Sequence, residues 1–189
     1  MIKSTLRAAA IAALIGTSTA VFADGHATGN PMVGGAEMFA EKNIVENAVN
    51  SADHTTLVAA VQAAGLVETL SSEGPFTVFA PVNAAFAALP EGTVDSLLQP
   101  ENKDQLVGVL TYHVIAGDIH SGDLVKMIED AGGELSVATV QGGELTFMVD
   151  GGAVKIMDGA GGTATVTIAD VDQSNGVIHV IDKVLLPAM

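Results

Sequence analysis

The chain has no cysteine among its 189 residues. It can therefore form no disulfide, and it cannot carry a lipid anchor on an N-terminal cysteine. A domain of about 150 residues buries roughly 70% of its unfolded surface, so its fold does not require such a staple. We expect the hydrophobic core alone to hold the domain together.

Positive charge is also scarce, and Arg7 is the single arginine. The formal net charge is −15, from 22 acidic residues against 7 basic ones. Binding to nucleic acid and to anionic lipid depends on Lys and Arg side chains. The composition therefore argues against a nucleic-acid partner and favours an acidic, soluble protein.

Several catalytic and cofactor signatures are missing. The sequence has no Gly-x-Gly-x-x-Gly or phosphate loop, no Gly-x-Ser-x-Gly, and no His-x-x-x-His or His-x-His spacing. The segment that begins at Asp170 opens like a calcium loop, but its twelfth position is Ile181, where a bidentate Glu is needed. We therefore expect no cofactor, no metal and no catalytic residue.

The first 23 residues predict a secretory leader. Lys3 and Arg7 precede an apolar run over residues 8–15, and Val21-Phe22-Ala23 forms a small-residue cleavage site before Asp24. The run is too short for a membrane span. We expect a periplasmic or secreted protein without membrane insertion, with a glycine-rich flexible lead-in over residues 24–40 and one domain over residues 41–187.

Helical periodicity begins near residue 41 and is supported by capping signals. Asp53 is expected to start a second helix, which Gly65 ends. Asn83 and Ser121 are expected to act as N-caps of further helices.

Strand patterns dominate from residue 134 onward. Short alternating segments separated by glycine-rich turns predict a β-meander. A long apolar strand over residues 177–186 closes the set, with the distant strand 76–80 as its expected partner. Helices first and strands later favour an α+β fold.

Three segments together resemble the fasciclin-like (FAS1) domain over about residues 41–187. Residues 77–89 read TVFAPVNAAFAAL, residues 175–187 read NGVIHVIDKVLLP, and Tyr112-His113 lies between them. The resemblance implies a β-wedge of two sheets with helices packed around it. It also implies an adhesion or interaction module of the cell exterior rather than an enzyme. The positions that carry the two signature segments are Thr77, Phe79, Pro81, Asn83, Phe86, Asn175, Gly176 and His179.

The resemblance also implies partner-binding positions. Tyr112-His113 lies in a segment implicated in receptor binding in animal members of the family. Asp170 precedes Asn175 by five residues, where animal members have an Asp-Ile pair linked to integrin recognition, and Val171 replaces the Ile. The partner-binding candidates are Tyr112, His113, Asp118, Ile119, His120, Asp170 and Val171.

Each candidate also has a structural interpretation. Tyr112 and His113 fit a hydrogen-bonded core pair, and Asp170 fits a solvent-facing acid beside a strand end, whose removal should change stability by under about 0.5 kcal/mol. Strand alternation predicts that His179 is a buried histidine, bonded to Asn83 or to a carbonyl of the first signature.

The function predicted from the sequence is non-catalytic attachment to other cells or surfaces. The expected partner is a protein or polysaccharide of a cell surface or matrix, and the chain is expected to be a monomer. The alternative is a periplasmic small-ligand-binding protein or enzyme with a pocket near His113 or His179.

Overall fold

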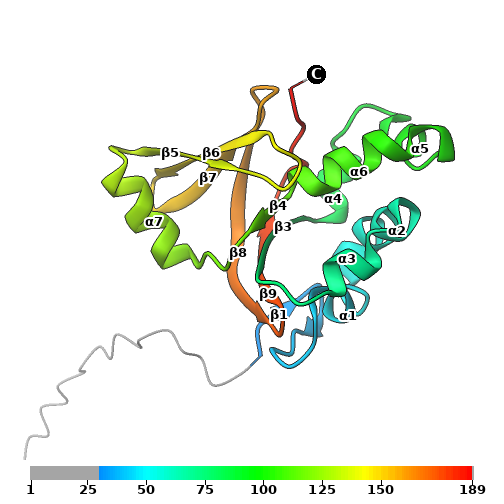
Figure 1. Ribbon diagram of the computed structural model, residues 1–189, viewed down its shortest axis with the longest axis horizontal. Coiled ribbons are helices and arrows are strands. Elements are labelled where there is room, and N and C mark those ends of the chain that lie inside the picture. Colours follow the sequence, from blue (N-terminus) through cyan, green and yellow to red (C-terminus); the bar gives the residue numbers. More distant parts are fainter. Residues whose placement is uncertain (1–29, 189) are drawn as a thin grey trace, which may run out of the picture.

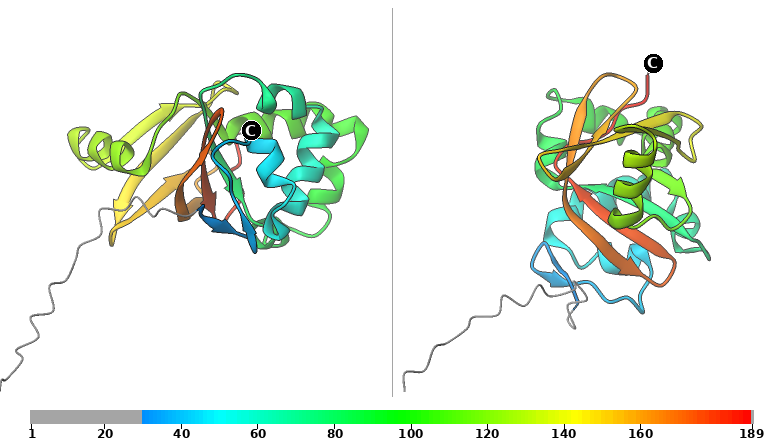
Figure 2. Two further views of the ribbon diagram at one scale, coloured as in Figure 1. Left: turned by 90° about the horizontal axis from the view of Figure 1, so that it is seen from below. Right: turned by 90° about the vertical axis from the view of Figure 1, so that its left-hand side faces the viewer.

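The computed structural model describes residues 30–188, so the predicted leader lies outside the described residues. A twisted β-sheet runs through the middle of the domain. Figures 1 and 2 show helices α1 to α6 on one side of the sheet and α7 (Ser121–Asp130) on the other. The α+β class and the helix-covered wedge are as predicted.

Local signals set the limits of several helices. Asn43 and Glu46 form a capping box, in which each side chain accepts a hydrogen bond from the other's backbone N–H. Gly65, with φ of 74°, ends the second helix as predicted. The helix begins at Thr55, and Asp53, the predicted start, lies in the preceding 3-10 turn. The helices and 3-10 turns before α7 are α1 (Ile44–Ala48), η1 (Ala52–His54), α2 (Thr55–Ala64), α3 (Val67–Ser71), α4 (Asn83–Ala87), α5 (Thr93–Leu97), η2 (Pro100–Asn102) and α6 (Lys103–Tyr112).

Two predicted N-caps have other roles. The cap position of α4 is Val82, and the Asn83 side chain instead accepts a hydrogen bond from Thr56 N at 3.0 Å, at the start of α2. The cap position of α7 is His120, and Ser121 is the first helical residue. Both predictions were wrong because sequence spacing does not reveal which helix end a polar side chain reaches in the fold.

The central sheet has seven strands in the order β4-β3-β9-β8-β7-β6-β5. The predicted long-range pair is confirmed, because β3 and β9 run parallel and pair Val78 with Ile178. The last strand ends at Ile181, earlier than the predicted 186. The strands of this sheet are β3 (Phe76–Pro81), β4 (Val114–Ala116), β5 (Glu134–Ala138), β6 (Glu144–Asp150), β7 (Ala153–Met157), β8 (Thr163–Gln173) and β9 (Gly176–Ile181).

Strand β8 joins the two halves of the wedge. Its first residues, 163–165, pair with β7, and residues 166–173 pair with β9. The register shifts between Val166 and Ile168 and again between Ile168 and Val171. Such bulges bend a strand and increase its twist, so one strand can serve both sheets.

Residues 30–40 differ from the predicted flexible lead-in. β1 (Met32–Val33) and β2 (Ala36–Glu37) form a small hairpin. The side chains of Val33 and Met38 are buried in the same apolar cluster as Ile44 of α1. The packed domain therefore begins before the predicted boundary at residue 41. Two-residue strands carry no readable periodicity, which is why the sequence did not reveal them.

The apolar core is divided by the sheet into two clusters. The helical core lies between the helices and the sheet, and the wedge core lies between the two halves of the sheet and α7. Large members of the helical core include Leu57, Val61, Val78, Leu110 and Ile178, and those of the wedge core include Phe79, Tyr112, Phe147, Ile156 and Ile181.

We expect Phe79→Ala to lower the free energy of unfolding by about 3–5 kcal/mol, because truncating a buried Phe leaves a cavity. The Phe79 ring centroid lies 5.3 Å from that of Phe147 and 5.5 Å from the His179 imidazole. Urea unfolding measures the change, and Met127→Ala is the control, since Met127 is exposed. Equal midpoints for the two variants would show that Phe79 does not hold the halves of the wedge together.

Candidate functional site

Two of the predicted segments meet on one side of the domain. Residues 117–120 connect β4 to Ser121, the first residue of α7, and residues 168–172 of β8 include its second register shift. The Asp170 carboxylate accepts a hydrogen bond from Ser121 N at 2.6 Å and a second from the Ser121 hydroxyl. We call residues 117–121 and 168–172 together the bulge surface.

Asp170 has a backbone conformation that is unusual for a residue with a side chain. Its φ is 55°, in the left-handed region that Asp and Asn tolerate better than most residues. The bulge turns its carboxylate toward the first turn of α7, where a negative charge suits the helix dipole. Asp170 is therefore half-buried and hydrogen-bonded, so the prediction of a solvent-facing acid was wrong, and we expect its side chain to contribute to stability.

His179 supports residues 117–121 from inside the domain. Its Nε2 donates to the carbonyl of Ile119 at 2.8 Å, which leaves Nδ1 as the acceptor for Asp170 N at 3.3 Å. Burial lowers the pKa of His179 and keeps the imidazole neutral, as both contacts require. The predicted burial is confirmed. The predicted partners, Asn83 or a carbonyl of the first signature, are replaced by Ile119.

Thr77 supports the same residues from β3. Its hydroxyl donates to Gly117 O at 2.8 Å and accepts from Ile119 N at 2.9 Å. Thr77, Phe79 and His179 share one face of the parallel β3–β9 pair, because Phe79 is paired directly with His179. Both signature segments therefore hold the backbone of residues 117–121 in place.

The exposed chemistry of the bulge surface is one imidazole between two carboxylates. His120 Nε2 lies 3.0 Å from Asp172 Oδ1, and His120 Nδ1 lies 3.7 Å from Asp118 Oδ1. Burial by itself lowers the pKa of His120. The hydrogen bond to Asp172 and the charges of Asp118, Asp172 and Asp170 together outweigh burial and raise that pKa. Side-chain exposure is 42% for His120, 47% for Asp118 and 62% for Asp172, so all three can contact a partner.

Sequence reasoning missed Ser121 and Asp172 as members of this surface. Asp172 lies two residues after Asp170, and residues two positions apart lie on the same face of a regular strand. That signal was available for Asp172. The contact between Ser121 and Asp170 joins residues 49 positions apart, and it had no sequence signal.

The candidate pair Tyr112-His113 lies inside the domain. The Tyr112 hydroxyl donates to Glu144 O at 2.7 Å and accepts from Gly159 N at 2.8 Å. His113 Nδ1 donates to a carbonyl of α6 at 2.7 Å, and Nε2 accepts from Leu185 N at 2.9 Å. The pair thus fastens the β6 and β7–β8 segments and the C-terminal segment to α6.

Burial excludes direct partner contact by three of the candidates. Tyr112, His113 and Val171 expose 1%, 3% and 1% of their surface. Ile119 is half-buried and packs against the wedge core. The exposed candidates are therefore Asp118 and His120, with Asp170 held beneath them.

The second signature contains two structural positions at the start of β9. The Asn175 side chain donates to Leu70 O at 2.7 Å and accepts from Ile44 N at 3.1 Å, which ties α1 and α3 to the sheet. Gly176 has φ of 151°, and a Cβ there would lie 1.9 Å from the carbonyl oxygen of Phe76. Only glycine fits this approach of two backbones.

The other signature positions are structural as well. Pro81 is the last residue of β3, and Phe86 of α4 packs against the helical core. None of them lines the bulge surface.

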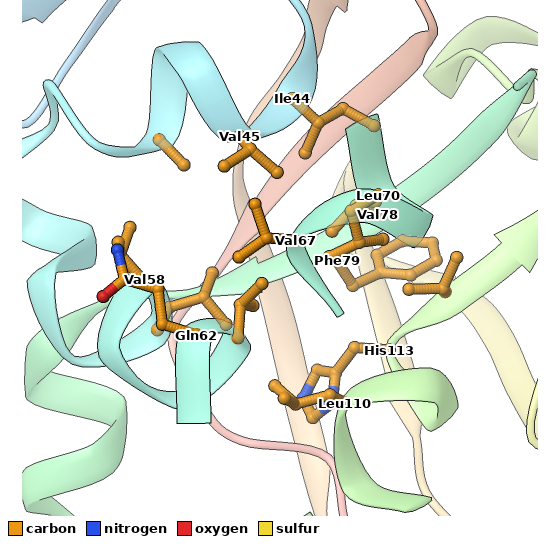
Figure 3. A pocket seen from close by; sticks show the side chains of 14 residues that line it. Ile44, Val45, Val58, Gln62, Val67, Leu70, Val78, Phe79, Leu110 and His113 are labelled. Atoms are coloured by element: carbon orange, nitrogen blue, oxygen red, sulfur yellow. The ribbon is translucent and has the colours of Figure 1, made fainter. Parts of the chain in front are cut away.

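A small cavity lies beside His113, where the alternative function required a pocket (Figure 3). Its volume is about 40 Å³, and apolar side chains of α1, α2, α3 and β3 surround it, with Gln62 as a further polar lining residue. Both ring nitrogens of His113 are already bonded to the backbone. An apolar cavity of this size, with both His113 nitrogens already bonded, offers no free acid, base or nucleophile to a substrate.

Within residues 30–188 no group of three His, Cys, Asp or Glu side chains is arranged to hold a metal ion. In the same part of the chain no helix has the length and apolar character needed to cross a membrane.

Comparison with known proteins identifies relatives of this sequence. The profile of the Fasciclin domain matches residues 52–187. Protein sll1483 of Synechocystis sp. is 58% identical over 146 residues, which cover 77% of this chain and 74% of that protein. Immunogenic protein MPB70 of Mycobacterium bovis is 34% identical over 184 residues, which cover 95% of this chain and 85% of that protein.

Two further similarities concern parts of longer chains. Transforming growth factor-beta-induced protein ig-h3 of Sus scrofa is 39% identical over 131 residues, which cover 69% of this chain and 17% of that protein. A solved FAS1 domain pair from the insect cell adhesion molecule Fasciclin I superposes with a TM-score of 0.52 at 24% identity, covering 67% of this chain and 42% of that one. The latter similarity shows the shared fold.

Acid should destabilise the domain through His113. Burial lowers its pKa from 6.5 to about 4, so the unfolded chain binds a proton more readily than the folded one. The stability due to the neutral imidazole is present above about pH 6.5 and is lost as pH falls toward 4, at up to ~1.4 kcal/mol per pH unit. Urea unfolding between pH 4 and 7 measures this loss.

The matched variants for that measurement are His113→Gln and His120→Gln. His113→Gln should be less stable at pH 7, but its stability should depend less on pH between 4 and 6.5. His120 has a raised pKa, so its charged form stabilises the fold at low pH, and this contribution is lost as pH rises through that pKa. If His113→Gln retains the pH dependence of the wild type, His113 does not contribute to the acid sensitivity of the domain.

Asp170→Ala should lower the free energy of unfolding by about 1–2 kcal/mol, because it removes the acceptor for Ser121 at the start of α7. Asp170→Asn keeps an acceptor and tolerates positive φ, so most of the stability should return. Asp172→Ala should change stability by under about 0.5 kcal/mol, since Asp172 is exposed. Thermal melts of the three variants test this order, and an unchanged melt for Asp170→Ala would contradict the structural role.

Proposed function

Because this chain belongs to the Fasciclin domain family, we propose that it is a non-catalytic, exported interaction module that attaches a cell to another cell or to a matrix. The observation that carries the proposal is the bulge surface, where both family signatures hold an exposed Asp118-His120-Asp172 group in a fixed position. The name of one similar structure describes a cell adhesion molecule. The leader predicted over residues 1–23 would deliver the protein to the periplasm or to the exterior.

The contact mechanism is docking onto a surface that is already ordered. Thr77, His179 and Asp170 bind the backbone of residues 117–121, so little conformational entropy is lost when a partner binds. Because this cost is small, a small surface can bind a partner with measurable affinity without an enclosed pocket.

The charge of the bulge surface indicates the chemistry of the partner. Carboxylates accept hydrogen bonds, so Asp118 and Asp172 suit the ammonium, guanidinium or amide groups of a protein, or the hydroxyl groups of a polysaccharide. The net charge of −15 gives the approach of a cationic partner a favourable long-range component. Partners rich in phosphate are repelled for the same reason.

We expect the triple variant Asp118→Asn, His120→Gln, Asp172→Asn to reduce attachment by about tenfold or more. The measurement adds purified protein to cells that lack the gene and counts the cells that attach to sister cells or to a matrix-coated surface. These three exposed substitutions should leave the melting temperature within about 2 °C of the wild type.

The matched control is Glu68→Gln together with Glu129→Gln, which removes exposed charges in α3 and α7 outside the bulge surface. The control should attach like the wild type. Normal attachment by the triple variant would show that the bulge surface is not part of the contact. Equal loss in the control would mean that net charge alone acts.

A further inference from the structure

A second surface with the dimensions of a binding site lies on the helical side of the domain. An open groove of about 830 Å³ runs between helices α5 and α6 and the C-terminal segment 186–188. The groove lies across the sheet from α7, beside the end of the chain marked C in Figure 1. It shares no lining residue with the bulge surface.

Gly108 in the wall of the groove has no structural explanation. It lies in the middle of α6, where glycine is the poorest helix former apart from proline. Its φ is not positive, and a Cβ built at this position meets no atom within 4 Å. Neither backbone conformation nor packing therefore requires glycine here. The effect of Gly108 is to leave the groove wall without a side chain at this position.

The lining of the groove combines apolar and acidic groups. Half-buried Leu97, Val109 and Leu186 supply apolar surface. Glu91 and Asp104 add carboxylates, and no Lys, Arg or His lines the groove. A matching occupant has apolar side chains for the floor and positive charges for the two carboxylates.

The open shape favours a polypeptide over a small molecule. Sites for small molecules usually enclose most of the ligand surface, whereas this groove is open to solvent. Hydroxyl and amide groups of Ser96, Gln105 and Gln141 are available to pair with the backbone of a peptide. A second copy of this chain is disfavoured, because each copy carries a net charge of −15.

We infer that this groove is a docking site for an extended polypeptide segment that alternates apolar and basic side chains, and that Gly108 keeps it open. The inference does not depend on the bulge surface. Two contact regions on different sides of one domain would let a single copy bridge two partners.

The test titrates the full chain, labelled with ¹⁵N, with the blocked peptide Lys-Leu-Ser-Leu-Lys, and follows backbone amide shifts by NMR. The largest shifts should fall in α5, α6 and residues 186–188. The counterpart Glu-Leu-Ser-Leu-Glu should bind at least about tenfold more weakly, because the groove carboxylates repel it.

Gly108→Gln is the blocking variant, and Gly122→Gln is its matched control. Gly122 is also a helical glycine, in α7, and a Cβ added to it would meet no atom within 4 Å. Gly108→Gln should weaken binding of the basic peptide by about tenfold or more. The melting temperature of this variant should stay at or above that of the wild type. Gly122→Gln should bind like the wild type.

Three results would overturn the inference. They are no binding of the basic peptide at millimolar concentration, equal binding of the acidic peptide, and shifts confined to the bulge surface. Self-association that is lost in Gly108→Gln would instead identify a second copy as the occupant. The triple variant of the bulge surface should bind the peptide normally, so the two proposals can fail separately.

Discussion

The parallel pairing of β3 with β9 is the contact on which the rest of the domain depends. It joins strands about a hundred residues apart, from Phe76 opposite Gly176 to Pro81 opposite Ile181. The pairing requires glycine at 176, where the backbone of Phe76 approaches too closely for a Cβ. One face of this pair packs against the helical core and the other against the wedge core, so both cores are built on the same two strands. Loss of this pair would remove the surface against which both cores pack.

The same pairing places polar groups where residues 117–121 cross the sheet. Thr77 and His179 lie on one face of neighbouring strands, and each bonds to the backbone of those residues. The bulge in β8 adds Asp170 as a third attachment, through Ser121. Two buried, uncharged side chains and one half-buried carboxylate thus fix the position of an exposed, charged surface. Residues that look like ordinary core sequence thereby support a contact surface that they do not themselves form.

Features that depend on the local sequence alone were predictable. The end of α2 at Gly65, the strand that carries Thr77 and the burial of His179 follow from glycine signals and strand alternation. The partners of polar side chains were not predictable, because they depend on tertiary placement. Asn83 bonds to the start of α2 rather than capping its own helix, and Asp170 reaches Ser121 through a bulge that no spacing rule encodes. For the candidate site, the sequence located the two segments but could not separate exposed from buried members.

The central claim is that the two signature segments hold residues 117–121 in one conformation, ready to bind. The most direct measurement is the hydrogen-exchange rate of the Ile119 amide, which donates to the Thr77 hydroxyl. This amide should be strongly protected in the wild type. In Thr77→Val it should exchange much faster while the amides of β9 remain protected, which shows local opening without global unfolding. Exchange of Ile119 in the wild type at the rate of an unstructured peptide would contradict the account.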